Sequence, residues 1–358
     1  PCAYISKIGV SLIMLSAKFV SLLTGNVSSY TLDMSFVGDW WMLLAVIAVL
    51  LAAFIIYLIV SPVKKKDKRR QIGKIRSAAI ALLVIVLSIG VYFFTDNSVE
   101  NIRTEGKVEV AFIDVGQGNC TVITCGDKVY VYDCGGTTEP GDRCAEYILS
   151  KGYTKIDKLI ISHMHDDHMN GVRTLVSKIR TREVMIPYTS PDPKEDEELH
   201  TYLNEHNTKM IILHDDETLN LDCATINLLL GHMTENADEN DNSTVLFLDF
   251  ADTDVLLCGD LSKVGEKKLI AEYPTLDTDI YSVGHHGSKY SACEEFLSQI
   301  TPEASVISCA KKNKYGHPSE ETIARLEKYG KIYYTMDSGN IIFTLDGEKY
   351  SVETKEAA

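Results

Sequence analysis

The chain has 358 residues, of which 45% are hydrophobic and 24% charged, so wholesale disorder is not expected. This length predicts about two domains. Its charge is unevenly divided. Residues 1–105 hold 11 basic and 6 acidic side chains, whereas residues 106–358 hold 24 and 44. The acidic part cannot attract nucleic acid by its bulk charge, so any such contact has to be local.

Two apolar stretches near the start are predicted to span a membrane. Residues 40–60 carry no charge, and 21 residues at 1.5 Å each cross the roughly 30 Å hydrocarbon layer. A second uncharged run ends in the interfacial aromatics Tyr92, Phe93 and Phe94, and we place this transmembrane helix at residues 77–95. Buried core helices are the alternative interpretation.

The segment between these stretches sets the expected topology. Residues 61–76 hold eight basic side chains and one acid, which favours a cytoplasmic loop, with a nucleic-acid patch as the alternative. Residues 1–39 are expected to form an interfacial amphipathic helix and an extracytoplasmic segment. The chain after residue 95 is then extracytoplasmic, in a multi-pass protein that contacts membrane lipid.

Residues 106–355 have the pattern of an α/β domain. Short β-branched and aromatic runs are broken by glycines, and later runs alternate with helix-like stretches. The early strands are expected to follow one another in antiparallel order, which suits two sheets covered by outer helices. Strands are expected at 108–116, 121–125, 128–136, 156–162, 225–230, 243–250, 253–260 and 279–284, and helices at 143–151, 169–179, 195–207, 262–273, 292–300 and 320–329.

The nine cysteines form no Cys-x-x-Cys pair, so neither a zinc ribbon nor a thioredoxin motif is indicated. Most are expected to be core thiols, with disulfides as the less favoured alternative.

The run His163-Met164-His165-Asp166-Asp167-His168 is the strongest chemical signal. It follows an apolar strand and places three imidazoles and two carboxylates in six residues. Neutral nitrogen and anionic oxygen ligands suit a borderline divalent cation. The alternative is a solvated polar turn.

Metal-capable residues also follow three later strands, and their repeated placement predicts a shared metal centre. These candidates are Asp260 in the run Cys-Gly-Asp, His285 and His286 in Gly-His-His-Gly-Ser, and His232 after the strand expected at 225–230. A lone histidine is more often a surface or core residue than a ligand.

These motifs in this order resemble the metallo-β-lactamase superfamily, which implies an αββα sandwich with a one- or two-metal hydrolytic centre. The finer set is similar to ComEC-type DNA-internalisation proteins of bacteria over residues 107–350. That set is FIDVGQGN, VYDCGG, IISHMHDDHMNG, ENDNSTVLFL, LLCGDL, SVGHHGSKYS and KYGHPS. In that family an OB-like DNA-binding region and most channel helices precede the part matched here, and these are expected partners.

The resemblance implies a role for each motif residue. His163 and His165 would bind one metal, Asp167 and His168 the second, and Asp260 would bridge them. His285 or His286 would complete the second site, and Asp133 would orient the ligand loop rather than bind metal. His317 matches a position near the scissile phosphate, and His232 has no counterpart.

Such a centre would hold two divalent cations, Zn²⁺ or Mn²⁺, which lower the pKa of a bridging water and neutralise charge on a phosphoryl or carbonyl oxygen. Asp167 would hold or accept the water's proton. His317 would stabilise the transition state or protonate the leaving oxygen. Its alternative role is to cap the helix expected to begin near Ser319.

Local positive charge indicates the substrate class. Lys311, Lys312 and Lys314 precede His317, and Lys289 follows the two histidines, which favours a phosphodiester strand. Gly287 and Ser288 would offer a backbone N–H and a hydroxyl to a phosphate oxygen, or simply make a turn.

The leading hypothesis is a metal-dependent phosphodiesterase or nuclease that degrades one strand of incoming DNA outside the membrane. The alternatives are a membrane-anchored hydrolase of envelope phosphodiesters or β-lactams, and a non-catalytic DNA-guiding module.

Overall fold

The computed structural model describes residues 106–188, 193–234 and 237–355. The expected segments 1–39, 40–60, 61–76 and 77–95 lie outside these residues. Within the described ranges, no helix combines the length and the apolar character needed to cross a bilayer.

The first sheet has eight strands in the order β15-β14-β1-β2-β3-β4-β5-β6. Strands β15 to β3 pair antiparallel, and β3 to β6 pair parallel. The strands are β1 (Val108–Phe112), β2 (Cys120–Cys125), β3 (Lys128–Cys134), β4 (Lys155–Ile160), β5 (Arg180–Pro187), β6 (Lys209–Leu213), β14 (Asn340–Leu345) and β15 (Tyr350–Lys355).

The second sheet has seven strands in the order β13-β12-β11-β10-β9-β8-β7. Its half from β7 to β10 is antiparallel, and its half from β10 to β13 is parallel. The strands are β7 (Glu217–Asn220), β8 (Thr225–Leu229), β9 (Val245–Phe250), β10 (Thr253–Leu257), β11 (Ile280–Ser282), β12 (Ala304–Ile307) and β13 (Lys331–Tyr334).

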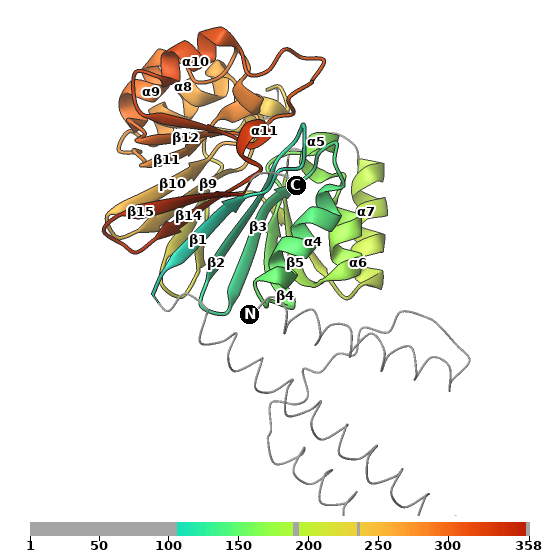
Figure 1. Ribbon diagram of the computed structural model, residues 1–358. Coiled ribbons are helices and arrows are strands. Elements are labelled where there is room, and N and C mark those ends of the chain that lie inside the picture. Colours follow the sequence, from blue (N-terminus) through green and yellow to red (C-terminus); the bar gives the residue numbers. More distant parts are fainter. Residues whose placement is uncertain (1–105, 189–192, 235–236, 356–358) are drawn as a thin grey trace, which may run out of the picture. The chain divides into compact units, whose positions relative to one another are not determined.

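Helices cover the outer face of each sheet (Figure 1). The first sheet carries α4 (Pro140–Ser150), α6 (Val172–Lys178) and α7 (Pro193–Glu205), and the second carries α8 (Lys263–Glu272), α9 (Glu294–Ile300) and α10 (Glu320–Leu326). Two short helices, α5 (Asp166–Met169) and α11 (Thr335–Ser338), lie in loops. The helix predictions are confirmed to within a few residues.

Alternation along the strands explains the layers. In β1, Val108, Val110 and Phe112 belong to the core between the sheets, whereas Ala111 belongs to the core under α4, α6 and α7. Successive side chains of a strand point to opposite faces, so a strand with both faces buried is apolar throughout. A third core lies between the second sheet and α8 to α10. The predicted αββα sandwich is confirmed.

The expectation for the cysteines is confirmed among the described residues. Six are free and buried, and one pair, Cys125 and Cys223, forms a disulfide with a sequence separation of 98. Cys125 ends β2 of the first sheet, and Cys223 lies between β7 and β8 of the second. The disulfide therefore joins the two sheets covalently.

Candidate metal centre

The predicted ligands come together because they follow parallel strands. The histidine-rich run follows β4 in the first sheet, Asp260 follows β10, and His285 and His286 follow β11 in the second. Polar loops at the carboxyl ends of adjacent parallel strands meet at one edge of a sheet. Here that edge exists in both sheets, and the two edges face each other across the sandwich.

Four of these residues form one compact group. Ligand atoms of Asp167, His168, Asp260 and His286 all lie within 4.8 Å of one another, and only Asp167 is not fully buried. His168 Nε2 lies 3.0 Å from Asp260 Oδ1. His286 Nε2 lies 3.3 Å from Asp167 Oδ2 and 3.5 Å from Asp260 Oδ1. Two imidazoles and two carboxylates therefore converge on one point.

Asp133 fixes the orientation of His168. The His168 Nδ1 atom lies 2.7 Å from Asp133 Oδ2, and both side chains are fully buried. The same carboxylate accepts the backbone N–H and the hydroxyl of Ser162. Since Asp133 can only accept when ionised, His168 donates through Nδ1 and turns the Nε2 lone pair toward Asp260.

His286 is oriented in the same way by a backbone carbonyl. Its Nδ1 lies 2.9 Å from the carbonyl oxygen of Ser308, which can only accept, so the Nε2 lone pair faces the carboxylates. Among the described residues, His168 Nε2, His286 Nε2 and Asp260 Oδ1 are buried atoms with no hydrogen-bond partner. Converging lone pairs without donors are costly in a protein interior, and a divalent cation satisfies all of them.

The pKa shifts have the same origin. Burial lowers the pKa of His168 and His286, but the carboxylates of Asp260 and its neighbours outweigh burial and raise both. Burial raises the pKa of Asp260, but His168 and His286 hold it well below its usual range. Burial also raises the pKa of Asp167, but His286 and His168 outweigh burial and lower this pKa to about 2. The carboxylates therefore favour positive charge beside them, either protons on the two imidazoles or a bound divalent cation that would displace those protons and use the Nε2 lone pairs.

His163 and His165 lie next to this group. Ser162 donates its hydroxyl to Asp133 and lies 3.1 Å from His163 Nδ1, so His163 donates there and its Nε2 carries the lone pair. That Nε2 lies 3.0 Å from His165 Nδ1. Burial and the nearby His168 hold the pKa of His163 well below its usual range, so its imidazole is neutral. The His/Asp cluster suits a dimetal site.

Two predicted ligands lie apart from the four-residue group. His232 is buried, but its Nε2 lies 3.1 Å from the carbonyl oxygen of Ser243 and is used to hold that loop. Burial lowers its pKa to about 4. His285 Nε2 lies 3.8 Å from Asp260 Oδ2, at the rim. Of the two adjacent histidines, His286 is therefore the one that joins the group.

Main-chain packing holds the ligand loop in place. A Cβ atom on Gly135 would lie 2.3 Å from the backbone nitrogen of His168, and one on Gly118 would lie 2.7 Å from the carbonyl oxygen of Asp167. Gly118 and Gly135 have to be glycine because backbone meets backbone there. The DVGQG and CGG motifs thus form the floor beneath the ligands.

The conformation of His285 and His286 is itself unusual. Both have positive φ angles, 51° and 53°, in the left-handed region. A non-glycine residue there costs on the order of 1–3 kcal/mol, and such residues cluster at functional sites. The turn aims His286 at the carboxylates and leaves His285 facing His317.

His317 lies beside the group, and its capping alternative is excluded. The Ser319 hydroxyl accepts the Thr322 N–H and caps α10 itself. The ring centroids of His317 and His285 are 5.6 Å apart. Burial, His285 and His286 lower the pKa of His317 to about 4. A neutral His317 imidazole can offer one N–H to a phosphate oxygen.

The lysines and Ser288 have different surroundings. Lys289, Lys312 and Lys314 are exposed on the loops that carry His286 and His317. Ser288 is buried, its N–H is donated to the His285 carbonyl, and its hydroxyl accepts the Tyr290 N–H. These hydrogen bonds place Ser288 in a turn, and a contact of its hydroxyl with a phosphate oxygen stays a prediction.

Sequence reasoning missed three residues around the site. Glu239 Oε2 lies 3.3 Å from His165 Nε2. The Ser243 hydroxyl accepts the Asp260 N–H and lies 3.4 Å from His163 Nδ1. The side chain of Asn313 forms hydrogen bonds with the backbone carbonyl and N–H of His317 in the same loop. The ENDNS motif was the available signal for Glu239 and Ser243.

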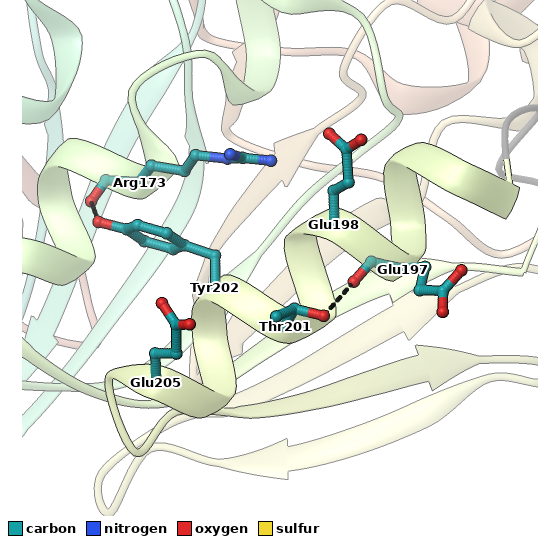
Figure 2. Close-up of a pocket in the computed structure, with 6 residues that line it drawn as sticks. All are labelled: Arg173, Glu197, Glu198, Thr201, Tyr202 and Glu205. Atoms are coloured by element: carbon teal, nitrogen blue, oxygen red, sulfur yellow. Dashed lines mark hydrogen bonds between the residues drawn. The ribbon is translucent and has the colours of Figure 1, made fainter.

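A separate open depression of about 450 Å³ lies on α6 and α7 (Figure 2). It is lined by Arg173, Glu197, Glu198, Thr201, Tyr202 and Glu205. Tyr202 donates its hydroxyl to the Arg173 carbonyl, and the other lining side chains are mostly acidic. None of them belongs to the metal-ligand group, so this depression is not the candidate centre.

The family model described as the metallo-β-lactamase superfamily matches residues 113–311, more than half of the chain, and these residues hold the whole ligand group. The chain belongs to the metallo-β-lactamase superfamily. A solved structure titled metallo-beta-lactamase fold protein YhfI, from Bacillus subtilis, has 12% identity and a TM-score of 0.46, and the match covers 66% of this chain and 99% of that one.

Curated relatives confirm the resemblance to ComEC-type proteins. ComE operon protein 3 of Bacillus subtilis is 27% identical over 67% of this chain and 33% of its own length. Recombination protein 2 of Haemophilus influenzae is 28% identical over 62% and 26%. Competence protein ComA of Neisseria gonorrhoeae is 26% identical over 67% and 33%. The chain thus spans about a third or less of the relatives it matches.

Proposed function

We propose that this chain is the hydrolytic part of a DNA-uptake protein, with a metal-dependent phosphodiesterase or nuclease activity on incoming DNA. The observation that carries the proposal is the convergence of unpartnered, buried lone pairs from His168, His286 and Asp260 on one point. Two of the curated relatives are named for competence or for the ComE operon, which supports the link to DNA uptake.

Two divalent cations in this centre would lower the pKa of a water and neutralise charge on a phosphate. The chain's own residues supply the rest. His286 and His168 outweigh burial and lower the pKa of Asp167 to about 2, so its carboxylate stays ionised near neutral pH and would hold the attacking water by a hydrogen bond. His317 would donate an N–H to a phosphate oxygen, and Lys289, Lys312 and Lys314 would attract the strand.

The extracytoplasmic location is part of the proposal. It rests on the expected spans at 40–60 and 77–95 and on the basic segment 61–76. The disulfide between Cys125 and Cys223 supports it, since disulfides persist in oxidising compartments. A reporter that is active only in the cytoplasm, fused after Ala358, should give no signal, and a strong signal would reverse the topology.

The activity is tested with the purified chain after loading with Zn²⁺ or Mn²⁺. We expect cleavage of single-stranded DNA and of bis(p-nitrophenyl) phosphate, but no turnover of the β-lactam nitrocefin. Nitrocefin turnover with intact DNA would instead establish the β-lactam alternative. Less than about a tenth of an equivalent of bound metal after loading would favour the non-catalytic DNA-guiding module, because two sites at full occupancy bind about twentyfold more.

A pair of matched variants links the activity to the centre. Asp260→Asn should reduce cleavage by at least about 100-fold, because it removes the carboxylate shared by both expected cations. Asp252→Asn makes the same change at an exposed residue that directly precedes β10, whereas Asp260 follows this strand. This variant should retain wild-type cleavage. Equal activity in both variants would refute the assignment of Asp260.

A further inference from the structure

The loop that carries His317 also presents an exposed aromatic ring. The side chain of Tyr315 is 55% exposed. Its ring lies parallel to that of His317, at 12°, with centroids 5.7 Å apart. Lys314 Nζ lies 4.9 Å from the centre of the same ring. A flat surface and a cation therefore occur together at the end of this loop.

Asn313 gives this loop a fixed shape. Its side-chain oxygen accepts the N–H groups of Tyr315 and His317, and its side-chain nitrogen donates to the carbonyls of Ala310 and His317. Gln117, from the DVGQG floor, also accepts the Ala310 N–H. All four hydrogen-bonding positions of the amide are used inside one loop. The position of Tyr315 is thus set by the fold rather than left to a ligand.

A row of rings connects Tyr315 to the metal-ligand group. His317 lies between Tyr315 and His285, with centroid distances of 5.7 and 5.6 Å, and His285 Nε2 is 3.8 Å from Asp260 Oδ2. Three rings, those of Tyr315, His317 and His285, would then lie between a planar group stacked on Tyr315 and the carboxylate of Asp260. The Lys314 ammonium would then lie beside a phosphate attached to that group.

We propose that Tyr315 is the stacking platform for a nucleobase close to the scissile phosphate, so that the preferred substrate is a single strand. The proposal rests on the nuclease function above and specifies its substrate class. Aromatic side chains bind the faces of unstacked bases, whatever their sequence, whereas a duplex hides those faces. The acidic domain thus gains nucleic-acid affinity locally, through one ring and a few lysines.

Tyr290 provides a matched control within the chain. It is 59% exposed, follows Lys289 as Tyr315 follows Lys314, and has the Lys289 ammonium 5.0 Å from its ring centre. It differs in its ring contacts, because no histidine of the centre stacks against it among the described ring pairs. The two tyrosines therefore separate the effect of the ring row from that of an exposed Lys-Tyr pair.

The test measures binding of a single-stranded oligonucleotide containing the fluorescent base 2-aminopurine to the EDTA-treated chain, beside an oligonucleotide of abasic sites. Wild type and Tyr290→Ala should bind the base-bearing strand about tenfold more tightly than the abasic strand, with quenched fluorescence. Tyr315→Ala should lose most of this tenfold preference, and Tyr315→Trp should keep it. Equal preference in Tyr315→Ala and wild type, or equal loss in Tyr290→Ala, would overturn the proposal.

Cleavage with bound metal separates this proposal from the nuclease function. If wild type quenches the fluorescent strand through Tyr315 but cleaves no DNA, the nuclease function fails and the platform stands. If wild type cleaves DNA and Tyr315→Ala has an unchanged KM, the nuclease function stands and the platform fails. Circular dichroism of Tyr315→Ala checks that its loss of preference is not a folding defect, and Tyr315→Phe, which keeps the ring, should retain most of the preference.

Discussion

The carboxylate of Asp133 lies 2.7 Å from Nδ1 of His168, with both side chains completely buried. Asp133 is not a member of the four-residue group, and yet its contact with Nδ1 determines which His168 nitrogen faces Asp260. It also has a φ of 57°, a left-handed conformation that aspartate and asparagine tolerate better than most residues. The strained residue at the end of β3 thus positions a ligand that follows β4.

Asp133→Asn should therefore lower the affinity for Zn²⁺ about 10- to 100-fold without unfolding the chain. Asparagine fits the same backbone but lacks the negative charge that holds His168 as a donor through Nδ1. Competition with a chromogenic chelator measures the affinity. The control is Asp157→Asn. Asp157 is also buried, but it lies in the first half of β4, away from the end that the histidine-rich run follows, so this variant should change the affinity little. The same loss in both variants would assign it to general destabilisation.

Replacing each of the paired histidines should give unequal results. His286→Ala removes a buried member of the four-residue group, so its loss of metal affinity should exceed the roughly 100-fold caused by losing an outer partner. His285→Ala changes a rim residue whose Nε2 is 3.8 Å from Asp260 Oδ2 and should cost less than about tenfold. Isothermal titration with Zn²⁺ distinguishes the two, and the reverse order would move the ligand to His285.

Much of this centre was predictable from the sequence because its residues are local. The run from His163 to His168 carries four candidates in one turn, and Asp260 and His286 follow apolar strands whose ends meet by the rules of parallel pairing. Strand β5 was harder to identify, since it begins with three charged residues in the run Arg-Thr-Arg-Glu. This strand forms because its second half is buried in the sheet, and burial by tertiary packing outweighs the low strand propensity of its charged residues.

Long-range contacts were beyond sequence reasoning. Strand β14 pairs with β1 across more than 220 residues, and nothing in either segment specifies its partner. The disulfide between Cys125 and Cys223 likewise depends on which loops the sheets bring together. The choice of His286 over His285 depends on two left-handed backbone positions in succession, which the sequence pattern does not reveal.

Removal of the disulfide should destabilise the domain by about 2–5 kcal/mol. A cross-link over 98 residues restricts the unfolded chain strongly. Cys125→Ser, Cys223→Ser and the double variant should lose similar free energies of unfolding in urea, because each removes the same bond. A reducing agent should lower wild type to that level and leave the variants unchanged. Losses that add in the double variant would mean that the thiols act separately.

Glu266 should make stability depend on pH. Burial raises its pKa to about 7, although its carboxylate accepts the N–H groups of Ala292 and Cys293 and faces Arg325. Between pH 4.5 and 7 the folded state holds a proton that the unfolded state has released, so stability falls as pH rises through this window. Above pH 7 the contribution is constant.

Glu266→Gln removes this titration. The difference in unfolding free energy between wild type and Glu266→Gln should therefore shift by about 2–3 kcal/mol against wild type from pH 4.5 to 7.5. Urea unfolding at a series of pH values measures it. Glu295→Gln, an exposed change on the neighbouring α9, is the control. A pH-independent difference would show that Glu266 is ionised throughout the window.

The contrast between the glycine floor and the loop of Tyr315 has a consequence for directed evolution. Around Gly118 and Gly135 no side chain can be added without moving main chain, so libraries there should return almost only the parent residue. Residues 311, 312, 314 and 315 are exposed, and the hydrogen bonds of Asn313 that shape the loop use main-chain groups, so mutations accumulate there at little cost in folding. New substrate preferences would therefore be selected in that short stretch while the catalytic chemistry is inherited unchanged.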